Sequence, residues 1–253
     1  MDTNKFHFGW VPDLPDHRDL LYAAPPHIAV KLPASVDLQS QCPPVYDQGQ
    51  LGSCTANAIG AAFEFALKKQ NAKDFMPSRL FIYYNERVIE NSVNSDSGAQ
   101  IRDGIKTVNK QGVCDELKWP YNITDFTKKP APACYQEALN NIVTSYHRIT
   151  HDLAQMKGCL AEGYPFVLGF SVYESFMSDK VAKSGNAPMP KKTEKCEGGH
   201  AVMAVGYDDA KKRFIIRNSW GTGWGMQGYF TLPYAYLKNA NLSDDFWTIR
   251  LVK

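Results

Sequence analysis

Cys54 is a cysteine whose position suits nucleophilic chemistry. Gly52 and Ser53 precede it, and the segment that follows, 55–70, reads as a helix that is apolar nearly all round. A thiol at the N-terminus of a helix lies near free backbone N–H groups and the positive end of the helix dipole. Both favour the reactive thiolate over an ordinary thiol of pKa about 8.5. Position alone also allows an inert core cysteine, the commonest fate of a free thiol.

His200 and Asn218 could supply the base that such a thiol needs. The β-rich runs around them flank a charged turn, a pattern typical of a hairpin. We expect the hairpin to centre near residue 209, which places His200 directly opposite Asn218, on the same face of the sheet and about 5 Å away. The amide could then accept the imidazole N–H and turn the ring toward a thiol. Taken singly, the two residues read as a sheet histidine and a turn asparagine.

The elements that must position these residues change in type along the chain. Helix and capping signals dominate the first half, and short β-rich runs dominate the second. This order indicates an α+β fold with a helical half, a sheet half and a cleft between them. The expected helices are 54–70, 78–89, 99–110 and 151–161, the expected strands are 166–173, 200–207, 214–220, 229–232 and 246–252, and 113–133 is expected to be a loop.

Several segments closely resemble the papain-like cysteine peptidases. The order of Gln, Cys, His and Asn agrees with that family, and the last of the carrying segments is highly specific to it. The resemblance covers about 32–253 and implies a two-lobed fold, with a helical left lobe over about 32–145 and a β-barrel-like right lobe over about 146–253. The carrying segments are Asp47–Cys54 (DQGQLGSC), Gly199–Val202 (GHAV) and Asn218–Gly225 (NSWGTGWG).

The resemblance implies a role for each matching residue. Cys54 would be the nucleophile, His200 the general acid and base, and Asn218 the residue that orients the imidazole. Gln48 would donate to the oxyanion hole, and Trp220 would shield the bond between Asn218 and His200 from water. The implied activity is that of an endopeptidase, which hydrolyses peptide bonds through an acyl-enzyme intermediate and needs no cofactor or metal.

The sequence also departs from the family pattern. Thr55 follows the nucleophile where plant and animal members carry Trp, and Leu51 replaces a disulfide cysteine; both resemble the bacterial branch, as does the segment 10–19 (WVPDLPDHRD). The Cys-x-Gly-Gly element of the cleft is missing. We therefore expect Gly98, with Gly199, to bind the substrate backbone.

The N-terminal extension, residues 1–31, stands in place of the family's long helical propeptide. It is rich in Pro and His and begins with aromatic residues, which need apolar surface to pack on. We predict that it covers the cleft as a short pro-segment and intramolecular inhibitor, so that the chain is a zymogen. The peptidase domain would then be 32–253.

Composition excludes several other classes of protein. The chain has 253 residues, 44% of them hydrophobic and 21% charged, as in an ordinary globular protein. A net charge of +2 offers no footprint for nucleic acid, and no apolar run is long enough for a membrane span. We expect a monomer acting on polypeptide substrates.

The six cysteines complicate the choice of compartment. If Cys54 stays a thiolate, five remain, and Cys114 with Cys134 is the expected disulfide because these residues flank the Pro-rich loop. A disulfide favours a secreted or extracytoplasmic protein. The first residues lack the basic and apolar regions of a signal peptide. Cys196 and His200 are four residues apart, but no convincing second pair completes a zinc site.

Two other functions remain open at this point. A catalytically silent peptide-binding module could share the scaffold, although such proteins usually lose one of the four polar residues. An acyltransferase that passes the acyl group to an amine would use the same residues. Labelling by an epoxide inhibitor separates the first alternative from a peptidase, and competition by added amines separates the second.

Overall fold

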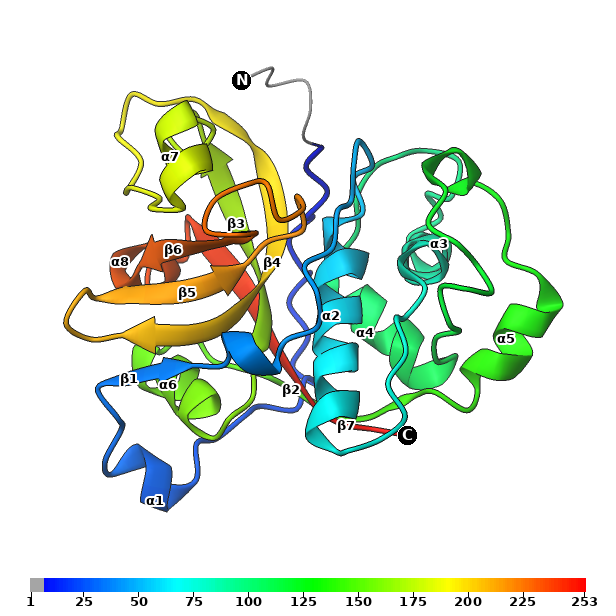
Figure 1. Ribbon diagram of the computed structural model, residues 1–253, viewed down its shortest axis with the longest axis horizontal. Coiled ribbons are helices and arrows are strands. Elements are labelled where there is room, and N and C mark those ends of the chain that lie inside the picture. Colours follow the sequence, from blue (N-terminus) through cyan, green and yellow to red (C-terminus); the bar gives the residue numbers. More distant parts are fainter. Residues whose placement is uncertain (1–6) are drawn as a thin grey trace.

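The protein divides into a helical side and a sheet side (Figure 1), and its structure, a computed structural model, describes residues 7–253. The start of the predicted extension, residues 1–6, lies outside the described residues. Helix α2 (Cys54–Lys69) stands at the seam, with strand β4 (Cys196–Asp208) on one side and helix α4 (Ile101–Lys110) on the other. All of its residues from Cys54 to Leu67 are buried. A helix that is apolar all round is covered on every face, as predicted.

The helices largely follow the capping signals in the sequence. The Ser78 hydroxyl accepts the Phe81 N–H at 3.2 Å, which fixes the start of one helix where it was expected. A helix that begins at Pro132 was not predicted, although proline is common in the first turn of a helix. The remaining helices are α1 (Pro26–Ala29), α3 (Arg79–Ile89), α5 (Pro132–Ala138), α6 (Leu153–Ala161), α7 (Asp179–Ser184) and α8 (Tyr234–Leu237), with 3-10 turns at Gln39–Gln41 and Ile123–Asp125.

In the described part of the chain the sheet has seven strands, in the order β2-β7-β3-β4-β5-β6, with β1 paired to β4 beside this path. The expected β-barrel-like lobe is wrong, because β2 and β6 lie at opposite ends and do not pair to close the sheet. Strand β7 packs against α2, so that end of the sheet faces the helical side. The remaining strands are β1 (Ser35–Asp37), β2 (Val143–Arg148), β3 (Phe166–Tyr173), β5 (Arg213–Arg217), β6 (Tyr229–Pro233) and β7 (Ser243–Val252).

The hairpin of β4 and β5 has a different register from the one expected. Met203 pairs with Arg217 and Asp208 with Arg213, so the hairpin centres near 210 rather than 209. Lys212 adopts a left-handed φ of 53° in the turn, and the register shifts between Ala204 and Gly206. These irregularities lengthen the connection, and β5 ends at Arg217, before Asn218. The predicted direct pairing of His200 with Asn218 is therefore wrong.

The N-terminal arm, which we define as residues 7–31, runs between the two sides of the molecule (Figure 1). Trp10 forms a parallel bridge with Ala99 on the helical side, and Leu21 forms another with Arg148 of β2. The arm therefore contacts both sides along its course.

Candidate active site

Cys54 is the first residue of α2, and its side chain is 0% exposed. Its Sγ accepts the backbone N–H of Ala201, in β4, at 3.3 Å. The helix and the sheet thus meet at the sulfur. The sequence predicted this meeting of Cys54 with the strand that carries His200.

His200 and Asn218 are joined by a side-chain bond in spite of the changed register. His200 Nε2 lies 2.8 Å from Asn218 Oδ1, which also accepts the Ser219 N–H at 2.9 Å. Because the accepting atom is the amide oxygen, we assign the imidazole proton to Nε2. Nδ1 is then the basic nitrogen; it is buried and has no hydrogen-bond partner among residues 7–253.

An aromatic wall surrounds the imidazole. Trp220 stacks on His200 with ring centroids 4.8 Å apart and an angle of 24°, and Phe170 contacts the ring edge-on at 5.8 Å. Trp220 is only 6% exposed. Burial lowers the pKa of His200 to about 4, although the hydrogen bond to Asn218 acts in the opposite direction. The imidazole is therefore neutral near pH 7 in this structure.

Gln48 is held rigidly beside the cysteine. Its Oε1 accepts the Ser219 hydroxyl at 2.7 Å, and its Nε2 donates to the Leu51 carbonyl at 2.9 Å. The same Nε2 donates to the His7 carbonyl of the arm at 3.1 Å. A backbone carbonyl of the arm thus occupies the amide donor that the sequence assigned to the oxyanion hole.

The arm crosses the cleft over the cysteine through a ladder of backbone bonds. Gly9 O accepts from Ala99 N at 2.8 Å, and Val11 N donates to Ala99 O at 3.0 Å. On the sheet side, Trp10 N donates to Gly199 O at 2.9 Å. The pairing with Ala99 is parallel. The arm therefore buries Cys54 by bonding to both walls of the cleft.

Glycines on both strands of this ladder permit the close approach. A Cβ on Gly9 would lie 1.7 Å from the Gly52 carbonyl oxygen, and one on Gly98 would lie 2.1 Å from the Gly9 oxygen. A Cβ on Gly199 would lie 2.5 Å from Trp10 O. Gly98 N donates to the Tyr83 hydroxyl at 3.2 Å, and it is Ala99 that pairs with the backbone of the arm, while substrate binding by Gly98 stays a prediction.

The pKa of Cys54 differs from the sequence expectation. Burial raises it to about 12, and the backbone N–H groups of Ala201, Gly9 and Thr55 offset only part of this rise. Helix position favours a thiolate only where the sulfur is not fully desolvated. With the arm in place, Cys54 is a neutral thiol.

A buried carboxyl group behind the nucleophile was missed in the sequence. Glu86 of α3 is 0% exposed, and its Oε1 accepts the hydroxyl of Thr55 at 2.6 Å. Burial raises the pKa of Glu86 well above its ordinary value. Gly104 of α4 leaves room for the carboxyl, because a Cβ there would lie 2.5 Å from Glu86 Oε2. Thr55 was noted only as a departure from the family pattern, and no local signal pointed to Glu86.

The side chain of Trp10 lies across β3 and β4. A Cβ on Gly169 would lie 1.9 Å from the indole, and Trp10 Nε1 donates to Asp245 Oδ2 at 3.0 Å. Asp245, on β7, is 1% exposed and was not predicted. The contact joins residues 235 positions apart in the chain, so no local pattern could reveal it.

All six cysteines in the described chain are free thiols. The predicted disulfide between Cys114 and Cys134 is therefore not formed, although the two thiols interact and the Cys134 thiol is a lesser cause, after burial, of the raised pKa of Cys114. Within residues 7–253 no group of His, Cys, Asp and Glu side chains could hold a metal ion. Over the same range, no helix has the length and apolarity to cross a membrane.

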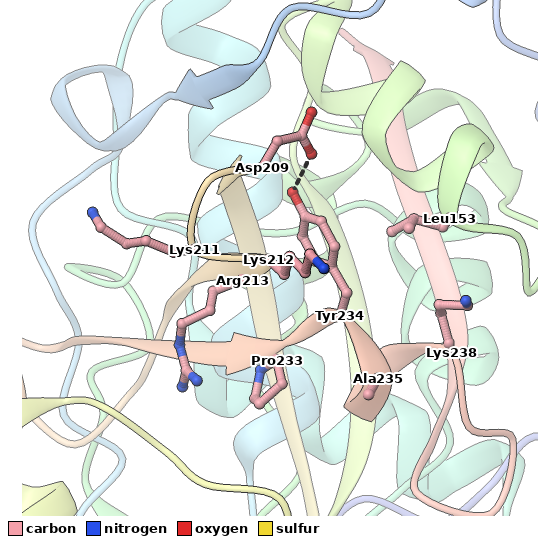
Figure 2. Close-up of a pocket in the computed structure, with 9 residues that line it drawn as sticks. All are labelled: Leu153, Asp209, Lys211, Lys212, Arg213, Pro233, Tyr234, Ala235 and Lys238. Atoms are coloured by element: carbon pink, nitrogen blue, oxygen red, sulfur yellow. Dashed lines mark hydrogen bonds between the residues drawn. The ribbon is translucent and has the colours of Figure 1, made fainter.

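A separate pocket of about 630 Å³ lies at the turn between β4 and β5 (Figure 2). Tyr234 lines it and donates to Asp209 at 2.8 Å, and the lysines Lys211, Lys212 and Lys238 also line it. His200 is near the other end of β4, and eight residues of strand span roughly 26 Å. This pocket is thus remote from Cys54.

Comparison with known proteins agrees with this geometry. Residues 32–246 match the papain family of cysteine proteases. An uncharacterized peptidase C1-like protein of Acanthamoeba polyphaga mimivirus is 47% identical, over all of this chain and 90% of its own length. Cysteine proteinase 2 of Entamoeba histolytica is 29% identical, over 81% of this chain and 65% of its own.

Among solved structures, the crystal structure of xylellain, a cysteine protease from the bacterium Xylella fastidiosa, is 48% identical to this chain. It superposes with a TM-score of 0.92, covering 97% of this chain and 96% of that one. The resemblance to the family's bacterial branch, predicted from the sequence, is confirmed. This chain belongs to the papain family of cysteine proteases.

Proposed function

We propose that the protein is an endopeptidase that cleaves peptide bonds through Cys54, His200 and Asn218. The observation that carries the proposal is the 2.8 Å bond from His200 Nε2 to Asn218 Oδ1, which leaves Nδ1 as a base in the wall that contacts Cys54. A thiol, a base and a residue that orients the base are the parts that a covalent mechanism needs.

In the proposed reaction, Cys54 Sγ bonds to the substrate carbonyl carbon while its proton passes to His200 Nδ1. The carbonyl electron pair moves to the oxygen, where Gln48 Nε2 and the Cys54 backbone N–H donate to the oxyanion. The C–N bond then breaks, and His200 gives its proton to the departing amine. Water attacks the thioester as His200 takes up a water proton, the C–S bond breaks, and the thiol recovers its proton.

Gln48 and Trp220 support this chemistry in different ways. The His7 carbonyl already accepts from Gln48 Nε2, so this donor is aimed at a carbonyl oxygen in the cleft. Trp220 stacks on the imidazole and is buried, which keeps water from competing for the Asn218 bond.

The arm, in this proposal, is an intramolecular inhibitor. It buries Cys54, its His7 carbonyl accepts the Gln48 amide N–H, and its backbone bonds to both walls of the cleft, at Ala99 and Gly199. Its pairing with Ala99 is parallel. A substrate must displace the arm before the thiol can reach a peptide carbonyl.

Labelling with an epoxide that alkylates papain-like thiols tests the proposal. We expect the parent chain and Cys196→Ala, which removes an exposed thiol, to be labelled at one site, and Cys54→Ala not to be labelled. The parent should also hydrolyse a peptide library with kinetics unaffected by added amines. Equal labelling of Cys54→Ala, or a product that carries the added amine, would contradict the proposed hydrolase.

A further inference from the structure

A buried pair of carboxyl groups anchors the arm to β7. The side chain of Asp13, on the arm, is fully buried, and Asp245 is 1% exposed. Asp245 Oδ2 accepts the Asp13 backbone N–H at 2.8 Å and Trp10 Nε1 at 3.0 Å. Two acidic side chains thus meet at the residues that hold the arm next to the cleft.

The two guanidinium groups near this pair also bind a third carboxylate, that of Asp19. Arg102 of α4 lies 2.6 Å from Asp19, and Arg148 of β2 lies 3.0 Å from Asp245 and 3.3 Å from Asp19. The nearest guanidinium nitrogen to Asp13, on Arg102, is 4.0 Å away. Three buried carboxyl groups therefore share two cations, which leaves one negative charge in excess.

Asp13 is the carboxyl group that receives only uncharged donors. Its Oδ1 accepts the backbone N–H of Arg102 at 3.1 Å, and its Oδ2 accepts Trp247 Nε1 at 2.9 Å. The other charged groups around the cluster are more exposed: Asp16 pairs with Arg18 and Lys106, and Asp244 shares Arg148 with the buried carboxyl groups.

The charge imbalance favours a bound proton while the arm is in place. Burial, and then the charge of Asp245, raise the pKa of Asp13 to about 7, and burial also raises the pKa of Asp245. A solvated aspartate has a pKa of about 3.9. The closed form therefore holds a proton that the open form releases, between about pH 4 and pH 7, and closure weakens as the pH rises through this range.

We propose that Asp13 and Asp245 form a carboxyl latch that keeps the arm over Cys54 at acidic pH and lets it open as the pH rises toward neutrality. The inference rests on the proposed role of the arm as a cover. Opening of the arm at a pH above this range would expose Cys54 without cleavage of the chain.

The protonation of Cys54 and His200 does not oppose opening of the arm as the pH rises. In the closed form Cys54 and His200 hold one proton, on the sulfur. In an open site that forms a thiolate and an imidazolium, the pair again holds one proton, now on the ring. Opening therefore moves a proton within the pair without changing its number, and the carboxyl pair carries the net change.

The test measures the labelling rate of Cys54 by a neutral epoxide from pH 5 to pH 7 in the full chain. Each rate is divided by the rate of the double variant Gly9→Ala/Asp13→Asn at the same pH, because that variant displaces the arm and cannot titrate Asp13, so the quotient cancels the titration of Cys54 itself. The variants are Asp13→Asn, which cannot ionise, and Asp16→Asn, which removes an arm carboxylate outside the buried pair.

A pKa of about 7 predicts that the quotient of the parent chain rises roughly 50-fold between pH 5 and pH 7. Asp16→Asn should rise equally, and Asp13→Asn should stay constant within about threefold. A constant quotient in the parent, or a parallel rise in Asp13→Asn, overturns the latch. If the double variant is labelled no faster than the parent at any pH, the proposed cover fails instead.

Discussion

Gly9→Ala should open the cleft without touching a residue of the catalytic set. The new Cβ would lie 1.7 Å from the Gly52 carbonyl oxygen, whereas real Cβ atoms stay beyond 3.0 Å. The arm must therefore move by more than an ångström at this point. The Gly52 backbone cannot yield easily, because its N–H donates to both oxygens of Asp96, at 3.0 Å each.

The size of the effect follows from the bonds that such a movement breaks. Three backbone hydrogen bonds hold the arm around Gly9, at 2.8 Å, 2.9 Å and 3.0 Å. At about 0.5–1.5 kcal/mol each, their loss favours opening by about 1.5–4.5 kcal/mol. That range corresponds to about a ten- to thousandfold increase in the ratio of open to closed molecules.

The assay is the rate of epoxide labelling of Cys54 at one pH, with Gly223→Ala as the matched control. Among residues 7–253 no atom lies within 4 Å of a Cβ added to Gly223, so this substitution should leave the rate unchanged. We expect Gly9→Ala to react at least tenfold faster than the parent and Gly223→Ala to match it. Equal rates in all three proteins would refute the reasoning, because the arm would then not limit access to the thiol.

Five further substitutions test the site and its support. Gln48→Ala in the open form should lower kcat for peptide hydrolysis by about 100- to 1,000-fold with little change in epoxide labelling, because it removes an oxyanion donor. Glu86→Ala should lower the free energy of unfolding in urea by about 1–3 kcal/mol, because Thr55 loses its acceptor. Because burial raises the pKa of Glu86 in the folded state, the free energy of unfolding is highest below the unfolded pKa of about 4.3 and falls as the pH rises toward the folded pKa. Glu86→Gln should remove this fall with pH. Arg79 lies 2.6 Å from Glu116, so Arg79→Met should lower the free energy of unfolding by about 3–5 kcal/mol, because the Glu116 carboxylate loses its guanidinium partner. Adding Glu116→Gln to the same chain should restore part of that free energy.

Local sequence was enough to single out the residues of the proposed catalytic set. Cys54 begins a helix whose apolar residues continue to Leu67, so both its burial and its helical position could be predicted. Gln48 and Asn218 lie in short segments that resemble the family, of which the Asn218 segment is highly specific, and the structure brings both to the cleft. Their catalytic roles stay predictions until the variants are measured.

The pairing of residues across the hairpin of β4 and β5 was predicted less accurately. With the turn at Lys212 and the shift between Ala204 and Gly206, the pairing partners differ from the expected ones by two to three residues, and hydrophobic alternation does not specify such irregularities. His200 nevertheless reaches Asn218, because Asn218 follows the end of β5 and its side chain is not bound by the strand register.

The arm shows the other limit of sequence reasoning. Its Pro-rich composition and aromatic start predicted an extension that packs on the body, and the structure shows His7 and Gly9 in the cleft. The anchoring of Asp13 to Asp245 depends on a contact between segments 232 positions apart. Desolvation by the arm, which no local pattern reveals, also explains why the pKa of Cys54 is raised rather than lowered.

Because the segment over Cys54 belongs to the same polypeptide, its local concentration at the cleft does not fall on dilution. Short connections of this kind give effective concentrations in the millimolar range. A free peptide therefore has to compete with a tethered segment, and a weakly binding substrate at micromolar concentration would rarely displace the arm from the cleft. In its proposed role as an intramolecular inhibitor, the arm would therefore set a minimum affinity that a substrate needs, and this minimum would not depend on the protein concentration.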